Sequence, residues 1–220
     1  MKRRTKFALA TVVAAKVAAL AFVVRPRYLR WGATEAETRE LLPGDEVVPQ
    51  ADLVATRAIT IAAPPDQVWP WIAQMGQGRA GFYTYDTLEN LVGCDIHSAD
   101  RVVSEWQGIA AGDDFRLHPD VALRVAAVEP GRALVISGGV PLGDSPPPYD
   151  FTWAFVLQDH RDGTTRLLVR ERYGYTRWWS ALLVEPVEAV SFVMSREMLR
   201  GIRERAEATR ITEPLERPAG

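Results

Sequence analysis

The chain has 220 residues, 47% of them hydrophobic, which is enough to bury the core of one ordinary domain with extensions. A formal net charge of -2 gives no broad electrostatic attraction for nucleic acid, so DNA and RNA are not expected partners. The single cysteine, Cys94, excludes an internal disulfide, and three separated histidines without H-x-x-x-H or C-x-x-C spacing predict no metal site.

The N-terminal region differs from the rest of the chain in being almost uniformly apolar. Residues 7–24, FALATVVAAKVAALAFVV, contain only Thr11 and Lys16 as polar residues and have about the length that crosses a bilayer. Basic and aromatic residues typical of membrane interfaces follow at Arg25, Arg27, Tyr28, Arg30 and Trp31. We interpret residues 1–30 as an uncleaved single-pass anchor, with a cleaved signal peptide ending near 19–21 as the alternative. The basic residues on the two sides favour an extracytoplasmic domain.

A short helix is predicted directly after this region. Thr34 and Glu37 form the S/T-x-x-E pattern of a capping box, and the helix is expected to stop at Pro43 and Gly44. We interpret residues 31–53 as a juxtamembrane helix and linker between the anchor and the domain.

The folded domain is expected to begin with a strand and a helix. The segment VATRAITIAA, from Val54, reads as a strand, and PPDQVWPWIAQM, residues 64–75, has an apolar helical side. Pro65 suits the first turn of that helix, and Pro70 is expected to kink it. A second short helix is predicted over YDTLENLVG, residues 85–93.

Between these two helices, residues 76–81 read GQGRAG and match the G-x-G-x-x-G fingerprint of a dinucleotide-binding loop. That loop works only after a strand and before a helix, where its glycines and the helix N-terminus meet the phosphates. Here the glycines follow a helix, so we interpret them as a C-cap and a sharp turn, and we expect no nucleotide.

Further strands and a long helix complete the predicted domain. The strands are DDFRLH, VALRVAAV, RALVISGG, DFTWAFVLQ and TTRLLVRERYGY, and their short separations imply an antiparallel meander. The helix carries apolar residues at steps of three or four, namely Leu183, Val187, Val190, Met194, Met198 and Ile202. Glu188 and Ser191 are expected on its other sides, and at Pro186 we expect either a break or the end of a separate short helix over residues 178–184.

The order of these elements suggests a curved sheet around the last helix. The segments that carry a family likeness are APPDQVWPWIAQMGQGRAGFYTYDTLENL, DIHSADR, TTRLLVRERY and EPVEAVSFVMSREMLRGIRERAE. Through them, residues 54–208 resemble the SRPBCC superfamily, also called START-like or Bet v 1-like, which includes polyketide cyclases and lipid carriers. The specific likeness is to membrane-anchored bacterial members without an assigned reaction. The resemblance implies an α+β helix-grip fold with a hydrophobic cavity between sheet and long helix; residues 209–220 are expected to be a disordered tail.

Residues facing the implied cavity follow from alternation along the strands and from the turn near its entrance. The expected ligand-binding residues are Tyr83, Tyr85, His97, Trp106, Trp153, Phe155, Glu171, Tyr173 and Met194. Glu171 is costly to bury unless it is paired or recognises a ligand. Arg170 and Arg172 point to the opposite face of the same strand and are expected to be exposed to solvent.

Two residues are candidates for acid–base chemistry. His97, in DIHSAD, is a histidine, the residue type most often used for proton transfer, and Glu89 shares a helical side with Asp86. Ion pairing with Arg79 or Arg101, and plain hydrogen-bonding support, are the structural alternatives for these residues.

From these features we expect a membrane-anchored module that binds or carries a small hydrophobic ligand, such as a lipid, isoprenoid or polyketide-like compound, without cofactor, metal or nucleotide. One alternative is a cyclase or dehydratase that acts on a polyketide-like substrate in the same cavity, with His97, Tyr83, Tyr85 or Glu89 positioning and protonating it. Another is a protein-interaction module that uses the fold without a ligand.

Overall fold

The computed structural model describes residues 24–160 and 162–212. Its strands are β1 (Leu53–Ile61), β2 (Asp114–His118), β3 (Val121–Glu129), β4 (Ala133–Gly138), β5 (Tyr149–Asp159) and β6 (Thr165–Tyr175). Its helices are α2 (Glu35–Arg39), α3 (Pro65–Ala73), α4 (Asp86–Leu91), the 3-10 helix η1 (Ser104–Trp106) and α5 (Ser180–Thr212). Residues 24–29 are also helical.

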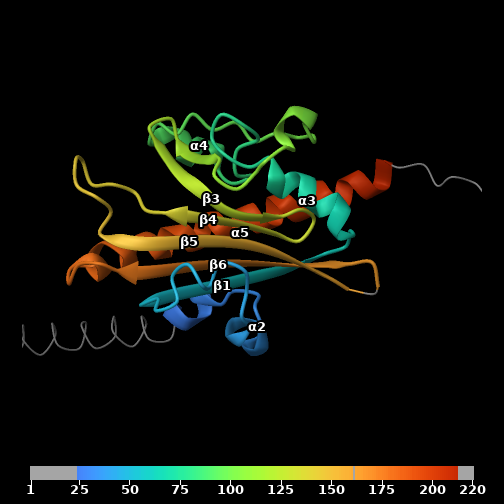
Figure 1. The fold of residues 1–220 in the computed structure, drawn as a ribbon. Coiled ribbons are helices and arrows are strands. Elements are labelled where there is room, and N and C mark those ends of the chain that lie inside the picture. Colours follow the sequence, from blue (N-terminus) through green and yellow to red (C-terminus); the bar gives the residue numbers. More distant parts are fainter. Residues whose placement is uncertain (1–23, 161, 213–220) are drawn as a thin grey trace, which may run out of the picture.

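These elements form an α+β fold around one antiparallel sheet. The strands lie in the order β1-β6-β5-β4-β3-β2, so the first strand in sequence pairs with the last, and α5 runs along one face of the sheet (Figure 1). This arrangement confirms the predicted α+β class with a curved antiparallel sheet and a long C-terminal helix. The predicted strands form because each carries apolar residues that can be buried on at least one face.

The main core lies between the sheet and the helices α3 and α5. Its helical residues include Val68, Trp71 and Ile72 on α3, and Met198, Leu199, Ile202 and Ala206 on α5. Two prolines, Pro70 in α3 and Pro186 in α5, lie inside helices that continue past them. The break expected at Pro186 is therefore wrong, and α5 begins before it.

The inward face of α5 differs from the predicted one along the first half of the helix. Val187 and Val190, expected on the apolar face, are 52% and 64% exposed, whereas Glu188 and Ser195 are buried. The physical reason is a buried arginine on β1, Arg57, which donates hydrogen bonds to both of these polar side chains. A buried charge must be paired, so this part of the helix turns its polar side inward.

The GQGRAG segment closes on itself after α3. Gly76 and Gly81 exchange backbone hydrogen bonds of 3.0 and 3.1 Å, and both have positive φ angles, which favour a residue without a Cβ. The amides of Gln77, Arg79 and Ala80 also donate to backbone carbonyls. These donors are thus already bound to carbonyls of the loop, of the end of α3 and of β2, and they do not form a phosphate cradle.

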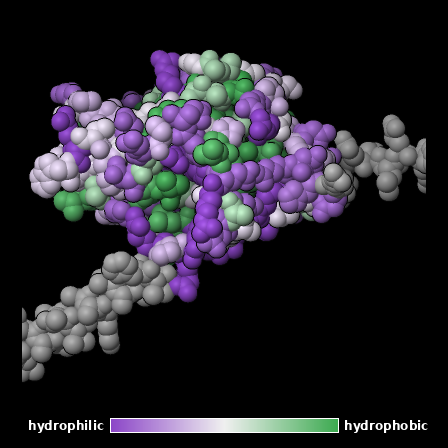
Figure 2. Space-filling view, turned by 60° about the horizontal axis from the view of Figure 1, so that its bottom comes forward, coloured by the Kyte–Doolittle hydropathy of each residue, from purple (hydrophilic) through white to green (hydrophobic). Residues whose placement is uncertain are grey.

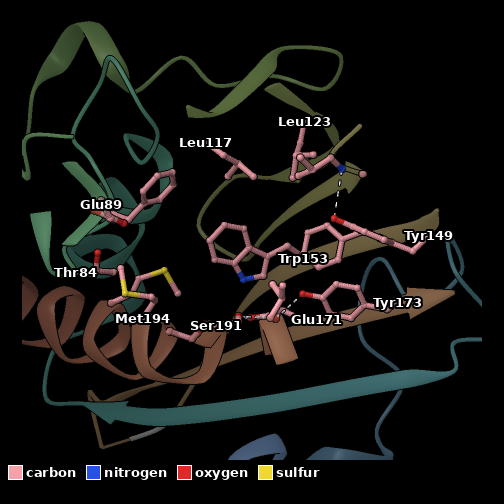
Figure 3. A pocket seen from close by; sticks show the side chains of 17 residues that line it. Thr84, Glu89, Leu117, Leu123, Tyr149, Trp153, Glu171, Tyr173, Ser191 and Met194 are labelled. Atoms are coloured by element: carbon pink, nitrogen blue, oxygen red, sulfur yellow. Dashed lines mark hydrogen bonds between the residues drawn. The ribbon is translucent and has the colours of Figure 1, made fainter. Parts of the chain in front are cut away.

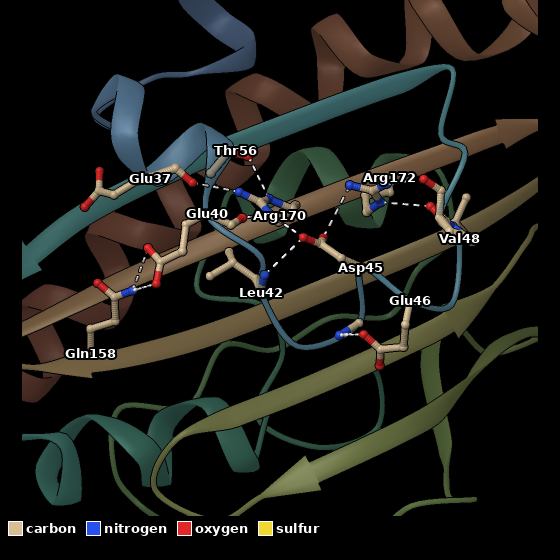
Figure 4. A network of polar contacts seen from close by, with 12 residues as sticks. Glu37, Glu40, Leu42, Asp45, Glu46, Val48, Thr56, Gln158, Arg170 and Arg172 are labelled. Carbon is tan, nitrogen blue, oxygen red and sulfur yellow. Dashed lines mark hydrogen bonds and ion pairs between the residues drawn. The ribbon is translucent and has the colours of Figure 1, made fainter.

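Residues 31–52 lie against the outer face of the sheet. Leu42 is buried there in an apolar cluster with residues of β1, β4, β5 and β6. Asp45 accepts hydrogen bonds from Arg170 at 2.6 Å and from Arg172 at 3.4 Å (Figure 4). The prediction that these two arginines are exposed to solvent is therefore wrong, because the segment before β1 covers them. Thr34 and Glu37 do form the predicted capping box of α2.

The predicted membrane localisation needs correction. Among the helices of the described ranges, none has the length and apolar character needed to span a bilayer. The apolar run at 7–24 and the alternative cleavage site lie outside the described residues, except for Val24. Of the predicted C-terminal tail, residues 209–212 belong to α5, and residues 213–220 are likewise outside the described part.

Some apolar side chains remain at the surface. In the view of Figure 2, apolar residues appear in patches among hydrophilic ones. Exposed apolar side chains occur on α4 at Leu88, Leu91 and Val92, and on α5 at Leu182, Val187, Val190 and Val193. Substitutions at these positions of α5 can therefore be made without opening the core.

Candidate functional site

A cavity of about 290 Å³ lies between the sheet and the first half of α5 (Figure 3). Strands β5 and β6 supply one wall, α5 supplies another, and the segments around residues 82–89 and 117–123 close it. Its larger apolar and aromatic residues include Phe82, Leu117, Leu123, Tyr149, Phe151, Trp153, Tyr173 and Met194. The cavity is thus mainly apolar, with a few polar groups at defined positions, as is typical of small-molecule sites.

Aromatic rings in mutual contact form the sheet side of the cavity. The ring centroids of Trp153 and Phe82 are 6.3 Å apart, and those of Tyr173 and Phe151 are 4.7 Å apart. Tyr149 lies 5.7 Å from Tyr173 by the same measure. Burial raises the pKa of both tyrosine hydroxyls, so they stay neutral in the physiological range. These aromatic side chains are therefore uncharged and held in place by ring packing.

A buried polar network centred on Glu171 lies at the junction of β6 and α5. Its carboxylate accepts hydrogen bonds from Arg57 at 2.9 Å, Ser195 at 3.0 Å and Ser191 at 2.9 Å. The hydroxyl of Tyr173 donates to it at 3.2 Å. Glu171 is therefore a paired buried carboxylate, with four protein side chains already bound to it.

A second carboxyl, Glu188, binds the same arginine. Glu188 is fully buried and accepts a hydrogen bond from Arg57. Burial raises the pKa of Glu188 to about 9, the nearby charge of Glu171 adds to the rise, and Arg57 opposes it. Burial and the charge of Glu171 thus favour the protonated form of Glu188, while Arg57 pairs with both carboxyls.

Three polar groups of the lining have no such partners. Figure 3 shows Thr84 and Glu89 on the side of the cavity away from Tyr149 and Tyr173. Burial raises the pKa of Glu89, and the nearby hydroxyl of Thr84 opposes this rise. The geometry between the two side chains is nevertheless not that of a hydrogen bond. The buried side-chain oxygen of Thr84, one oxygen of Glu89 and the indole nitrogen of Trp153 have no hydrogen-bond partner among the described residues.

Metal-binding side chains do not gather in this region. Within residues 24–160 and 162–212, no three His, Cys, Asp or Glu side chains form a group that could hold a metal ion. The polar groups of the cavity are instead carboxyls, hydroxyls and one indole nitrogen. This arrangement can bind a ligand through apolar contacts and a small number of hydrogen bonds.

The structure brings part of the predicted site together around the cavity. The predicted residues that line it are Glu89, Trp153, Glu171, Tyr173 and Met194. They come from α4, β5, β6 and α5, which are far apart in sequence. Their role as ligand contacts stays a prediction.

Three other predicted site residues belong to the core. The Tyr83 hydroxyl donates to the carbonyl of Trp71 at 3.0 Å. Phe155 is fully buried beside Trp153, with ring centroids 4.8 Å apart, and Trp106 packs against the main core. These side chains support the walls and do not line the cavity.

Tyr85 and His97 lie at the surface. The Tyr85 hydroxyl donates to Glu197 at 3.2 Å, and the side chain of His97 is 83% exposed, with its ring 3.4 Å from Asp95. Neither residue lines the cavity. Of the two catalytic candidates, Glu89 is the one positioned to meet a molecule bound there.

Sequence reasoning missed most of the polar part of the site. The missed residues are Arg57, Thr84, Tyr149, Glu188, Ser191 and Ser195. Two signals could have identified some of them. An arginine stands in the middle of a largely apolar strand, and residues 188, 191 and 195 are spaced to share one side of a helix.

Comparisons with known proteins give only distant similarity. No family model matches the chain, and no curated protein matches it. Among solved structures, it is similar to protein MLL2253 from Mesorhizobium loti, with 15% identity and a TM-score of 0.44 over 74% of this chain and 100% of that one. A point mutant of norcoclaurine synthase from Thalictrum flavum, in complex with a transition-state analogue, has 12% identity and a TM-score of 0.47 over 72% and 96%. Ms6760 from Mycobacterium smegmatis has 16% identity and a TM-score of 0.40 over 74% and 93%. Similarity at this level carries no functional argument, which therefore has to come from the cavity itself.

Proposed function

We propose that this chain is a binding or carrier module of the SRPBCC type that holds a small hydrophobic ligand between the sheet and α5. The observation that carries the proposal is the cavity of about 290 Å³ with aromatic walls. Moving apolar surface from water into such a cavity contributes about 25 cal/mol for each Å². The arrangement of an antiparallel sheet around one long helix supports membership of the superfamily that the sequence resembles.

The ligand we propose is compact, such as an isoprenoid or polyketide-like molecule or a small lipid. The cavity of about 290 Å³ is slightly smaller than the range of about 300–1,000 Å³ that is usual for small-molecule sites. The rings of Phe82, Phe151 and Trp153 offer flat surfaces. These features favour a ring-bearing molecule over a long acyl chain.

An enzyme of the cyclase or dehydratase type is a second candidate, favoured by Glu89. A carboxyl in the cavity wall whose pKa is raised by burial is shifted toward the protonated form and can act as a general acid. We prefer the binding role because the other carboxyl of the lining, Glu171, is already held by four side chains.

Native mass spectrometry of the full chain after incubation with an extract of small hydrophobic compounds tests the binding role. The unmodified protein should carry a discrete added mass. Val187→Trp should lose it, because Val187 lines the cavity and its exposure leaves room for the larger side chain to cover the opening. Val190→Trp, on the same helix but outside the lining, is the matched control and should keep it.

Two results would contradict the proposal. One is the absence of any bound mass in the folded, unmodified protein, and the other is equal retention by both tryptophan variants. The enzyme alternative is distinguished by turnover, because a carrier should release its bound compound chemically unchanged. Conversion of the bound compound by the unmodified protein, lost in Glu89→Gln, would favour the enzyme.

A further inference from the structure

The charged groups that line the cavity are acidic. Of the described lining residues, Glu89 and Glu171 carry carboxyls, and none is a lysine, arginine or histidine. The arginine of the neighbouring network, Arg57, already donates to Glu171, to Glu188 and to the carbonyl of Tyr28. A ligand carboxylate or phosphate would therefore lose its hydration in the cavity without gaining a counter-charge.

A cationic ligand is also poorly matched, although aromatic rings can attract cations. The carboxylate of Glu171 is neutralised by Arg57 and accepts further hydrogen bonds from Ser191, Ser195 and Tyr173. Burial raises the pKa of the second carboxyl, Glu89, which favours its uncharged form. The paired Glu171 thus supplies no free negative charge, and burial disfavours the charged form of Glu89.

The unpartnered polar groups show what the cavity offers instead. In Figure 3 the indole of Trp153 lies in the middle of the lining, with its nitrogen turned toward the α5 side. This buried nitrogen has no partner among the described residues, and an indole N–H can only donate. Thr84 contributes a buried hydroxyl and Glu89 a buried carboxyl oxygen, and these atoms also have no hydrogen-bond partner among the described residues. Buried polar groups of this kind are costly unless a partner satisfies them.

We propose that the cavity selects an uncharged, ring-bearing ligand with an oxygen acceptor that receives a hydrogen bond from Trp153 Nε1, and with a polar group near Thr84 and Glu89. The inference rests on the proposed function and narrows its ligand class. Neutral ketones, quinones and phenols fit these groups, whereas fatty acids and amines do not.

Equilibrium dialysis of the full chain against four naphthalene probes tests this selection. The probes are naphthalene, acetonaphthone, naphthoate and naphthylmethylammonium, which share one ring system and differ in charge and hydrogen bonding. Acetonaphthone should bind about tenfold more tightly than naphthalene, because its carbonyl accepts the indole hydrogen bond. Naphthoate and naphthylmethylammonium should both bind more weakly than naphthalene.

Trp153→Phe removes the N–H and keeps an aromatic ring. It should weaken acetonaphthone about five- to tenfold and leave naphthalene nearly unchanged. Trp106→Phe is the matched control, because Trp106 packs against the core outside the cavity lining.

The outcomes separate the inference from the proposed function. Binding of naphthalene with equal or tighter binding of naphthoate or the ammonium probe would overturn the inference and leave the proposed function standing. Equal loss of acetonaphthone binding in Trp153→Phe and Trp106→Phe would also overturn it. Binding of none of the four probes would contradict both.

Discussion

Strand β6 carries two arginines on one face and a carboxylate on the other. The polar networks around them differ in how completely their hydrogen-bonding groups are paired. Arg170 and Arg172 point to the outer face, where residues 31–52 cover them. Glu171 and Tyr173 point to the inner face, toward α5 and the cavity. Both networks are buried, so burial alone does not distinguish a structural clamp from a site.

In the outer network, the guanidinium of Arg170 finds its hydrogen-bond acceptors within the protein. Arg170 donates to Asp45 at 2.6 Å and to the hydroxyl of Thr56 at 2.9 Å. It also donates to the carbonyls of Glu37 and Glu40, both at 2.7 Å (Figure 4). The covering segment thus supplies the acceptors that the arginine needs, and the network fastens that segment to the sheet.

The inner network borders an open space. Arg57 donates to two carboxyls, one of which shares the cavity lining with the unpartnered nitrogen of Trp153. The comparison teaches that the informative feature is the polar group left without a protein partner. Substitutions that remove one network at a time should therefore have different consequences for stability and for binding.

Arg57→Met should have the largest effect on stability. It leaves two buried carboxyls without their cation, which should lower the free energy of unfolding by about 3–5 kcal/mol. Chemical denaturation measures the loss. In the triple variant R57M/E171Q/E188Q much of the stability should return, because the charges that needed the arginine are gone. No recovery would contradict this account of the inner network.

Arg170→Met should cost less, about 2–3 kcal/mol, because Asp45 keeps its hydrogen bonds from Arg172 and from the amide of Leu42. Hydrogen exchange should also show faster exchange in residues 37–49, which the arginine fastens. Ligand binding should be unchanged if the outer network is only a clamp. Loss of binding at unchanged folding would show that the two faces are coupled.

The pH dependence of stability should report Glu188. Its pKa is raised from 4.5 to about 9, so between these values the folded state holds a proton that the unfolded state lacks. Stability should therefore fall as the pH rises through this window, by at most about 1.4 kcal/mol for each pH unit. Glu188→Gln should flatten the profile. An unchanged slope in that variant would assign the titration to another group.

Glu37→Gln should have the smallest effect. Arg166 binds Glu37 at 2.7 Å and lowers its pKa to about 2, so the stability from this pair is present above pH 4.5 and is lost as the pH falls through about 2. We expect a loss of about 1 kcal/mol at neutral pH and almost none in strong acid. Acid titration followed by circular dichroism, with Glu35→Gln as an exposed control on the same helix, measures the difference.

Much of the fold was predictable because local patterns agreed with it. The strands could be read from apolar alternation, and the side of β6 that carries Glu171 and Tyr173 was assigned correctly. The inward face of α5 was not, because Glu188 and Ser195 read as surface residues until Arg57 is placed opposite them. Hydrophobic periodicity does not encode a long-range buried ion pair.

The site also contains residues that could be predicted from the sequence and residues that could not. Strand residues such as Trp153 and Tyr173 were predictable, because alternation fixes which face they join. Tyr85 and His97 lie in segments whose direction depends on turn geometry, and the structure puts both at the surface. Burial of Arg170 was missed because the segment that covers it is more than a hundred residues away in sequence.

A crystal structure of the protein soaked with acetonaphthone would show whether the cavity binds this ligand. We expect the ring system in the cavity between Phe151, Trp153 and Met194, with the ketone oxygen about 3 Å from Trp153 Nε1. A cavity filled by the protein's own side chains, or a ligand bound only elsewhere on the surface, would contradict it.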